Sequence, residues 1–255
     1  FMAGTGVVNG TPKLFWGDVR SYNNPKFTET DISTQHLAQY DVATTKHQFA
    51  IAEWDFAGRY VLLKHTYIPE GSDSKIQWLR FDRDNPKEMI DVTNIASVDI
   101  LDAHFIGTNG NELYVLQNGG HVRQMNVGGA SLSRPVLSGV QSFVLYGSET
   151  IAYVGTEANV KVAGVWKKGW EQSRIMYRAA SAQTDDTVKI KASKYFNKDT
   201  VVVTVNDTAQ IYRGDLRPPT EDSEAVKKFL NSVKKVAFGR TIKDLTLNSD
   251  GRMVI

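Results

Sequence analysis

Short apolar runs, separated by polar turn residues, recur along this chain of 255 residues. They are rich in β-branched and aromatic side chains, and Gly, Asp, Asn or Pro stands between them, which is typical of β-strands joined by tight turns. The first group of four runs covers residues 49–52, 60–63, 76–81 and 89–92. Four short strands within about 45 residues predict one four-stranded antiparallel unit.

The same group of four predicted strands recurs further along the chain. The second group covers residues 100–106, 113–116, 121–127 and 132–137, the third covers 140–146, 151–154, 160–166 and 173–178, and the fourth covers 188–192, 201–205, 209–212 and 235–238. The segment Gly58-Arg59-Tyr60-Val61 is nearly repeated as Gly251-Arg252-Met253-Val254, roughly four periods of about 48 residues later. The repeat predicts an all-β fold, a β-propeller of about five four-stranded blades.

The fifth blade is incomplete, because only two predicted strands, 242–247 and 253–255, follow the fourth group. Two spare strands are predicted near the N-terminus, at 13–16 and 37–42. We expect these N-terminal strands to complete the C-terminal blade and so close the ring, which would protect its exposed edges. The alternative is that the chain is a piece of a larger propeller.

Two segments lie outside this repeat. A helix is predicted at about 220–233, because two prolines precede Thr220 as N-cap, acidic residues fill the first turn, and apolar residues then recur at helical spacing. We interpret this helix as a packing insertion within the fourth blade that covers a blade edge or the rim of the ring. The alternative is that this amphipathic helix docks a partner. Residues 1–10 are expected to be an N-terminal extension or the remnant of an artificial junction, and residues 11–255 a single propeller domain.

The composition of the chain excludes several classes of binding partner and of catalytic chemistry. The net charge is only +2, and the densest lysine cluster follows acidic residues, so the chain lacks the basic stripe that nucleic-acid binding needs. The absence of cysteine excludes disulfides, thiolate metal sites and cysteine nucleophiles. No run of about 18 apolar residues exists, so membrane association is expected only through a segment absent from this chain.

One turn carries a resemblance to a known family. The segment Asn248-Ser249-Asp250-Gly251-Arg252-Met253-Val254 resembles the turn of the WD40-like repeat in TolB-type bacterial propellers, although both it and a degenerate copy at 55–61 lack the proline of that repeat. The chain from about residue 11 is also similar to the propeller portion of bacterial surface proteins that carry a PEGA domain. This resemblance implies an extracytoplasmic, non-enzymatic module, anchored to the membrane in the full-length protein.

Acidic residues on predicted inner strands suggest an alternative, enzymatic function. Glycoside hydrolysis needs two carboxyl groups at a defined separation, one as acid and one as nucleophile or base. The candidates are Glu53, Asp99, Asp102, Asp186 and Asp244. Their more common role beside a strand is to cap it or to accept hydrogen bonds from loop amides. The five histidines show no metal-ligand spacing, so neither a metal nor another cofactor is expected.

Two tryptophans are the candidate ligand-binding residues. Trp166 and Trp170 bracket Lys167-Lys168-Gly169, a predicted hairpin, so one of the two rings is expected to be exposed for stacking on a sugar or a partner surface. The alternative for both is packing between blades. Taken together, the repeat architecture and the absence of a catalytic motif predict a non-catalytic scaffold that binds a protein or glycan. The family resemblance alone implies that this scaffold acts outside the cytoplasm at a bacterial cell surface. A glycoside hydrolase that uses Glu53, Asp99 and Asp102 is the alternative.

Overall fold

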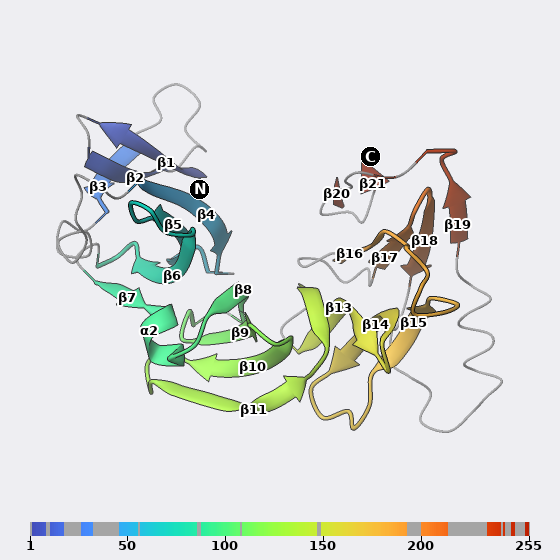
Figure 1. The fold of residues 1–255 in the computed structure, drawn as a ribbon. Coiled ribbons are helices and arrows are strands. Elements are labelled where there is room, and N and C mark those ends of the chain that lie inside the picture. The colour runs from blue at the N-terminus through green and yellow to red at the C-terminus, as the bar shows by residue number, and fades with distance from the viewer. Residues whose placement is uncertain are drawn as a thin grey trace. The chain divides into compact units, whose positions relative to one another are not determined.

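The chain forms two compact units, and the residues that the structure describes in them are mostly β-strand (Figure 1). The first unit comprises Phe1–Asn118 and Val122–Val136, and the second comprises Gly119–His121 and Leu137–Ile255. The structure, a computed structural model, describes residues 2–8, 11–17, 27–32, 46–55, 57–85, 88–107, 109–146, 149–192, 200–213, 234–240, 242, 246–247 and 253–254. Within these ranges, no helix is both long enough and apolar enough to cross a membrane.

The first unit begins with a three-stranded antiparallel sheet of β1 (Met2–Val8), β2 (Thr11–Gly17) and β3 (Phe27–Asp31). The predicted strand at 13–16 lies within β2, whereas the predicted strand at 37–42 lies outside the described residues. β1 pairs with β2 along its whole length, although its residues were expected to form an extension. The sequence pattern hides this strand because Gly4 and Gly6 have no side chains that alternate between the two faces of a sheet.

Two four-stranded sheets complete the first unit and confirm the first two predicted groups. The first sheet has the strand order β4-β5-β6-β7, and each pair of neighbouring strands in it is antiparallel. The second sheet has the strand order β11-β10-β9-β8. Their bounds are β4 (Lys46–Trp54), β5 (Tyr60–Ile68), β6 (Lys75–Asp82), β7 (Met89–Asp91), β8 (Ile100–Phe105), β9 (Glu112–Gln117), β10 (His121–Asn126) and β11 (Ser131–Leu137).

A short helix, α2 (Val92–Ala96), separates these two sheets. The sequence pattern extends the last strand of the first sheet to Val92, but the structure ends β7 at Asp91. The Asp91 carboxylate accepts a hydrogen bond from the Asn94 backbone N–H at 2.9 Å, so Asp91 acts as an N-cap. Ser97 ends the helix in the left-handed conformation, with φ of 54°.

The second unit contains two more four-stranded sheets, which confirm the third and fourth predicted groups. Their orders are β12-β13-β14-β15 and β16-β17-β18-β19, and β20 pairs separately with β21. The predicted helix at 220–233 lies outside the described residues. The bounds are β12 (Val140–Tyr146), β13 (Thr150–Glu157), β14 (Val160–Lys167), β15 (Arg174–Arg178), β16 (Val188–Ala192), β17 (Thr200–Val205), β18 (Thr208–Arg213), β19 (Lys234–Ala237), β20 (Thr246–Leu247) and β21 (Met253–Val254).

Consecutive sheets pack face to face within each unit. In β5, Val61 and Leu63 join the cluster that also holds Leu14 and Trp16 of the preceding sheet. Leu62, which points the other way, joins the cluster that holds Ala103 of the next sheet. The run Val61-Leu62-Leu63 is therefore buried on both faces of the sheet, which explains why it is apolar without alternation.

This arrangement of consecutive four-stranded antiparallel sheets is consistent with a β-propeller of about five blades. Ring closure by the N-terminal strands remains a prediction, because it joins the first unit to the second.

Candidate functional site

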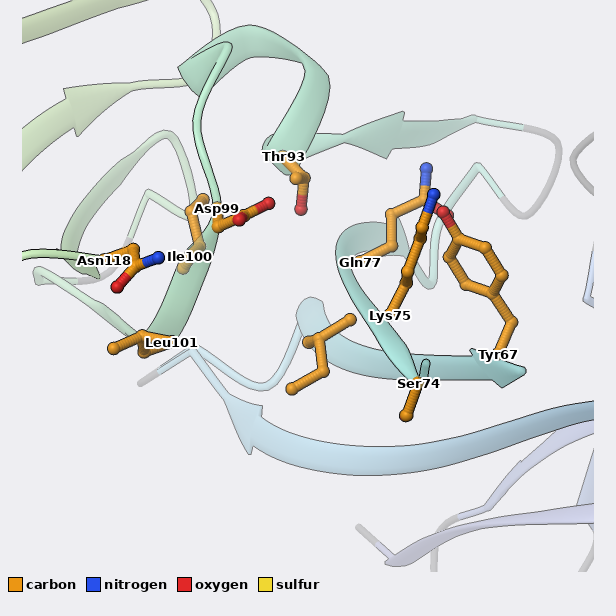
Figure 2. A pocket seen from close by; sticks show the side chains of 10 residues that line it. Tyr67, Ser74, Lys75, Gln77, Thr93, Asp99, Ile100, Leu101 and Asn118 are labelled. Atoms are coloured by element: carbon orange, nitrogen blue, oxygen red, sulfur yellow. The ribbon is translucent and has the colours of Figure 1, made fainter. Parts of the chain in front are cut away.

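A cavity of about 590 Å³ opens in the first unit where the sheet β4–β7 meets α2 and the sheet β8–β11 (Figure 2). This volume is within the range of small-ligand sites, about 300–1,000 Å³. Most of its lining side chains are polar, and they come from strand ends and turns. They are Tyr67, Ser74, Lys75, Ile76, Gln77, Thr93, Asp99, Ile100, Leu101 and Asn118.

The cavity has two walls of opposite charge. Figure 2 shows Lys75 on the wall formed by β5 and β6, and Asp99 on the wall formed by the start of β8. Both side chains are exposed, and neither forms an ion pair with any residue that the structure describes. On the Asp99 wall lies Leu101, an apolar side chain that is 46% exposed.

Backbone and side-chain hydrogen bonds fix the turns that carry these groups. The Asn118 backbone N–H donates to the Asp99 carbonyl oxygen at 3.1 Å, which ties the turn after β9 to the start of β8. The hydroxyl oxygen of Thr93 on α2 accepts a hydrogen bond from the Trp78 backbone N–H at 2.8 Å. The Trp78 indole in turn donates to the Ile100 carbonyl oxygen at 3.0 Å. The two walls are therefore linked through α2 and β6.

A ladder of polar side chains crosses the first four-stranded sheet, and one of its members, Gln77, lines the cavity. One residue from each strand takes part: His47, His65, Gln77 and Asp91. The two imidazoles are hydrogen-bonded at 2.9 Å, His65 contacts the Gln77 amide oxygen at 3.2 Å, and the Gln77 amide donates to the Asp91 carboxylate. The Phe49 ring stacks on His65 at 4.2 Å between ring centroids.

This ladder holds a cavity residue in place. His65 is fully buried, and Gln77, which lines the cavity, is bonded on both sides. Burial lowers the pKa of His47 below its ordinary value of 6.5, because desolvation disfavours the charged imidazolium. An interior polar chain of this kind rigidifies a sheet when its members satisfy one another.

Two of the predicted carboxylates meet at one histidine rather than in the cavity. Glu53 of β4 lies 3.0 Å from His104 Nδ1, and Asp102 of β8 lies 3.5 Å from His104 Nε2. The Glu53 carboxylate also accepts a hydrogen bond from the Phe105 backbone N–H at 3.3 Å. These contacts join the first strands of two successive sheets, across 51 residues of sequence.

The other predicted carboxylates are dispersed. Asp99 lies in the cavity wall, and Asp244 lies outside the described residues. Asp186, in the second unit, accepts hydrogen bonds from the Tyr177 hydroxyl and, at 2.8 Å, from the Asn206 amide. These two hydrogen bonds lower the pKa of Asp186. Burial, together with the hydrogen bond to Asp186, raises the pKa of Tyr177 to about 12.

The two candidate tryptophans pack together in the second unit. Trp166 is 8% exposed and its indole N–H donates to the Trp170 carbonyl oxygen at 3.1 Å, so its ring is occupied by internal packing. Trp170 is half-buried against the core cluster of β13–β17. Ligand binding by Trp166 and Trp170 remains a prediction, with Trp170 the more accessible of the two.

Most cavity residues could not be found from sequence. Tyr67, Lys75, Thr93 and Asn118 belong to no motif, and they converge only because the strand ends and α2 meet in space. Asp99 is the exception, since its place beside a predicted strand made it a candidate.

No protein-family model and no curated protein matches the chain. Among solved structures, the chain is similar to TolB from Acinetobacter baumannii, with 11% identity over 80% of this chain and 48% of TolB, at a TM-score of 0.44. It is also similar to Oligopeptidase B from Leishmania major, with 11% identity over 96% of this chain and 40% of the peptidase, at a TM-score of 0.49. A third similarity is to an oligogalacturonate lyase in complex with manganese, with 8% identity over 98% of this chain and 76% of the lyase, at a TM-score of 0.40.

The chain thus spans about half of TolB and less than half of the oligopeptidase. TM-scores below 0.5 carry no argument about function, and the assignment of fold class rests on the order and packing of the sheets.

Proposed function

We propose that this chain is a non-catalytic binding module that engages a protein or glycan through the cavity of the first unit. The observation that carries the proposal is the composition of the cavity wall. Among the described residues that line it, Asp99 is the single carboxylate, beside one lysine and several neutral polar and aliphatic groups. A concave site with few converging polar groups is the usual form of a ligand pocket.

The same observation counts against hydrolysis in this cavity. Glycoside hydrolysis requires a second carboxyl group about 5–10 Å from the first. Glu53 and Asp102, the other named candidates of the first unit, are engaged with His104 and with backbone N–H groups of β8. Their contacts fit a role in joining two sheets.

A glycoside hydrolase remains the alternative function, because Glu53 and Asp102 converge on His104 from two strands. That alternative predicts release of reducing sugar by the purified chain, and loss of this activity in Glu53→Gln.

The proposal includes a location. We propose that the module acts outside the cytoplasm at a bacterial cell surface, in a full-length protein anchored through a segment outside this chain. This part rests on the resemblance of the turn at 248–254 and of the chain from about residue 11 to TolB-type and PEGA-associated propellers.

The experiment is a binding screen of the purified chain on a glycan array and on a peptide library, with sugar release followed in the same samples. Leu101→Arg places a bulky charged side chain in the cavity wall, and the control is Phe238→Arg, at another exposed apolar residue, which is 36% exposed in the second unit. We expect binding without sugar release, and a loss of binding in Leu101→Arg alone. Binding that survives Leu101→Arg, or release of sugar, would overturn the proposal.

A further inference from the structure

The cavity has features that distinguish between a sugar and a peptide as its ligand. Resting on the function proposed above, we infer that the cavity binds a peptide segment that carries an acidic and a basic group on either side of an aliphatic side chain. Lys75 would receive the acidic group and Asp99 the basic group, while the aliphatic side chain would lie against Leu101 and Ile76.

Charge complementarity is the first argument. Lys75 and Asp99 lie on opposite walls, and neither is neutralised by an ion pair within the described part of the chain. A ligand that carries only positive or only negative charge would be attracted by one wall and repelled by the other. A ligand that carries one positive and one negative group is attracted by both walls, and the positions of Lys75 and Asp99 determine the direction in which it binds.

Apolar exposure is the second argument. Leu101, the second residue of β8, is 46% exposed, whereas Ile100 and Ala103 of the same strand are buried. Leu101 lies where the pairing of β8 with β9 shifts register, between Ile100 and Asp102. An isolated exposed leucine has little meaning, but this one lines a cavity together with half-buried Ile76. Covering these branched side chains favours an aliphatic group on the ligand.

The hydrogen-bonding groups match a peptide backbone. Asn118 presents an exposed carboxamide, which can both donate to a carbonyl oxygen and accept from an N–H. The Thr93 hydroxyl accepts from Trp78 and retains its own O–H as a donor. A peptide group needs one donor and one acceptor at neighbouring points.

The aromatic content argues against a sugar. Sugars stack on flat, open aromatic faces, and Tyr67 supplies the one aromatic ring among the described lining residues. That ring already contacts His65, with centroids 5.2 Å apart and a tilt of 32°. The branched side chains of Leu101 and Ile76 offer no flat surface in its place.

The test uses pentapeptides with Leu or Val at the centre, an acidic residue on one side and a basic residue on the other, in both orders. Each is fluorescently labelled through an added side chain, and each is made with blocked and with free termini. Binding is measured by fluorescence polarisation for the wild-type chain, Lys75→Glu, Asp99→Lys and the double variant Lys75→Glu/Asp99→Lys. The control is Asp185→Lys/Lys234→Glu, a charge exchange at exposed residues of the second unit.

We expect the wild-type chain to prefer one charge order, and each single variant to bind that order roughly tenfold or more weakly. The double variant should recover binding with the opposite charge order, which a merely structural role of these residues would not produce. Equal binding of blocked and free peptides would identify an internal segment of a protein as the source. A requirement for free termini would identify short free peptides.

Three results would overturn the inference. Peptide binding that is insensitive to the single variants would remove the role of the two charges. Binding of glycans but not peptides, lost in Leu101→Arg, would overturn the peptide inference and leave the proposed function standing. Absence of binding to either library would overturn both.

Discussion

The two units bury different kinds of side chain. In the first unit, Asp55, His65, Gln77, Arg80, Asp82 and Gln117 are buried polar or charged residues, whereas Thr150 and Thr204 are their counterparts in the described part of the second unit. Burying such groups costs free energy unless they are hydrogen-bonded, so the first unit depends on specific contacts and the second depends mainly on apolar packing. The cavity lies in the unit that depends on specific contacts.

Asp82 illustrates how these contacts work. Burial tends to raise its pKa, but hydrogen bonds from Arg59, at 2.7 and 3.0 Å, and from the Asp84 backbone N–H outweigh burial, so the pKa is lowered. The Asp82 carboxylate therefore stays charged although it is buried at the end of β6. If the comparison is correct, polar substitutions in the first unit should be costly and similar ones in the second unit should be mild.

The largest effect is expected for Arg80. Its guanidinium is 4% exposed, donates to the Gly110 carbonyl oxygen and the Asn111 side chain, and pairs with Glu88 at 3.1 Å. Arg80→Ala would leave these groups without their donor and should lower the free energy of unfolding by about 3 kcal/mol. Urea-induced unfolding, followed by circular dichroism, measures this change.

The matched change in the second unit is Arg178→Ala. Arg178 pairs with Glu157, but the two side chains are 47% and 56% exposed. An exposed pair contributes less than about 1 kcal/mol. Equal losses in the two variants would contradict the comparison between the units.

A smaller effect is expected where the backbone rather than a side chain is constrained. Gly110 has φ of 61°, and an added Cβ would lie 2.0 Å from Tyr60 Cδ2. The Tyr60 ring cannot readily move, because the guanidinium groups of Arg59 and Arg80 lie 4.9 and 4.7 Å from its centroid. Gly110→Ala should therefore cost about 2 kcal/mol or more, from backbone strain and the clash together.

Gly169 in the second unit is the control for that substitution. It has φ of 88°, but no atom lies within 4 Å of an added Cβ, so Gly169→Ala should cost only the backbone penalty of about 1 kcal/mol. Thermal unfolding of both variants compares the two positions. A Gly169→Ala loss as large as that of Gly110→Ala would remove the role assigned to Tyr60.

These contrasts also mark what the sequence could and could not predict. The strands were predictable in both units, because apolar runs bounded by turn residues depend on local pattern alone. β1 and α2 were not, since Gly4 and Gly6 interrupt the pattern of the strand and the helix spans only five residues.

The candidate site was predictable only through Asp99. The remaining cavity residues, and the pairing of Glu53 with His104, depend on contacts between strands that are far apart in the chain. Sequence pattern carries no signal for such contacts. The hairpin position predicted that one of Trp166 and Trp170 is exposed, but it could not tell which, because it does not reveal which indole N–H donates to a carbonyl oxygen.

The units should also differ in their response to pH. The pKa of His47 is lowered in the folded chain, so between its ordinary value of 6.5 and its folded value the unfolded chain binds more protons. Stability is therefore complete above pH 6.5 and is lost as the pH falls below it, by at most about 1.4 kcal/mol per pH unit. Unfolding midpoints between about pH 8 and about pH 5 should show this slope, and His47→Gln should remove it.

In the second unit, stability is expected to fall at a lower pH than in the first unit. The pKa of Asp186 is lowered from 3.8, so its contribution is present above that pH and is lost only as the pH falls below it. Asp186→Asn should leave the slope near pH 6 unchanged. A slope there that follows Asp186 rather than His47 would contradict the assignment.

The smallest effect is expected for Tyr177 at the same carboxylate. Its folded pKa of about 12 lies above its ordinary value of 10.0, so between these values the unfolded chain binds fewer protons than the folded chain. The stability that this group contributes is present below pH 10 and is lost as the pH rises toward 12. Tyr177→Phe should cost about 1 kcal/mol near neutral pH, because Asp186 keeps the hydrogen bond from Asn206.

Ultraviolet titration of tyrosinate tests this assignment directly. The difference between the wild-type chain and Tyr177→Phe should show one tyrosine that ionises near pH 12. Tyr153, whose pKa burial also raises, is common to both chains and cancels in the difference. If Tyr177 instead ionised near pH 10, its hydroxyl would not be hydrogen-bonded to Asp186, and Asp186 would be bonded only to Asn206 and solvent. The polar cluster of the second unit would then be a surface feature, unlike the buried ladder beside the cavity.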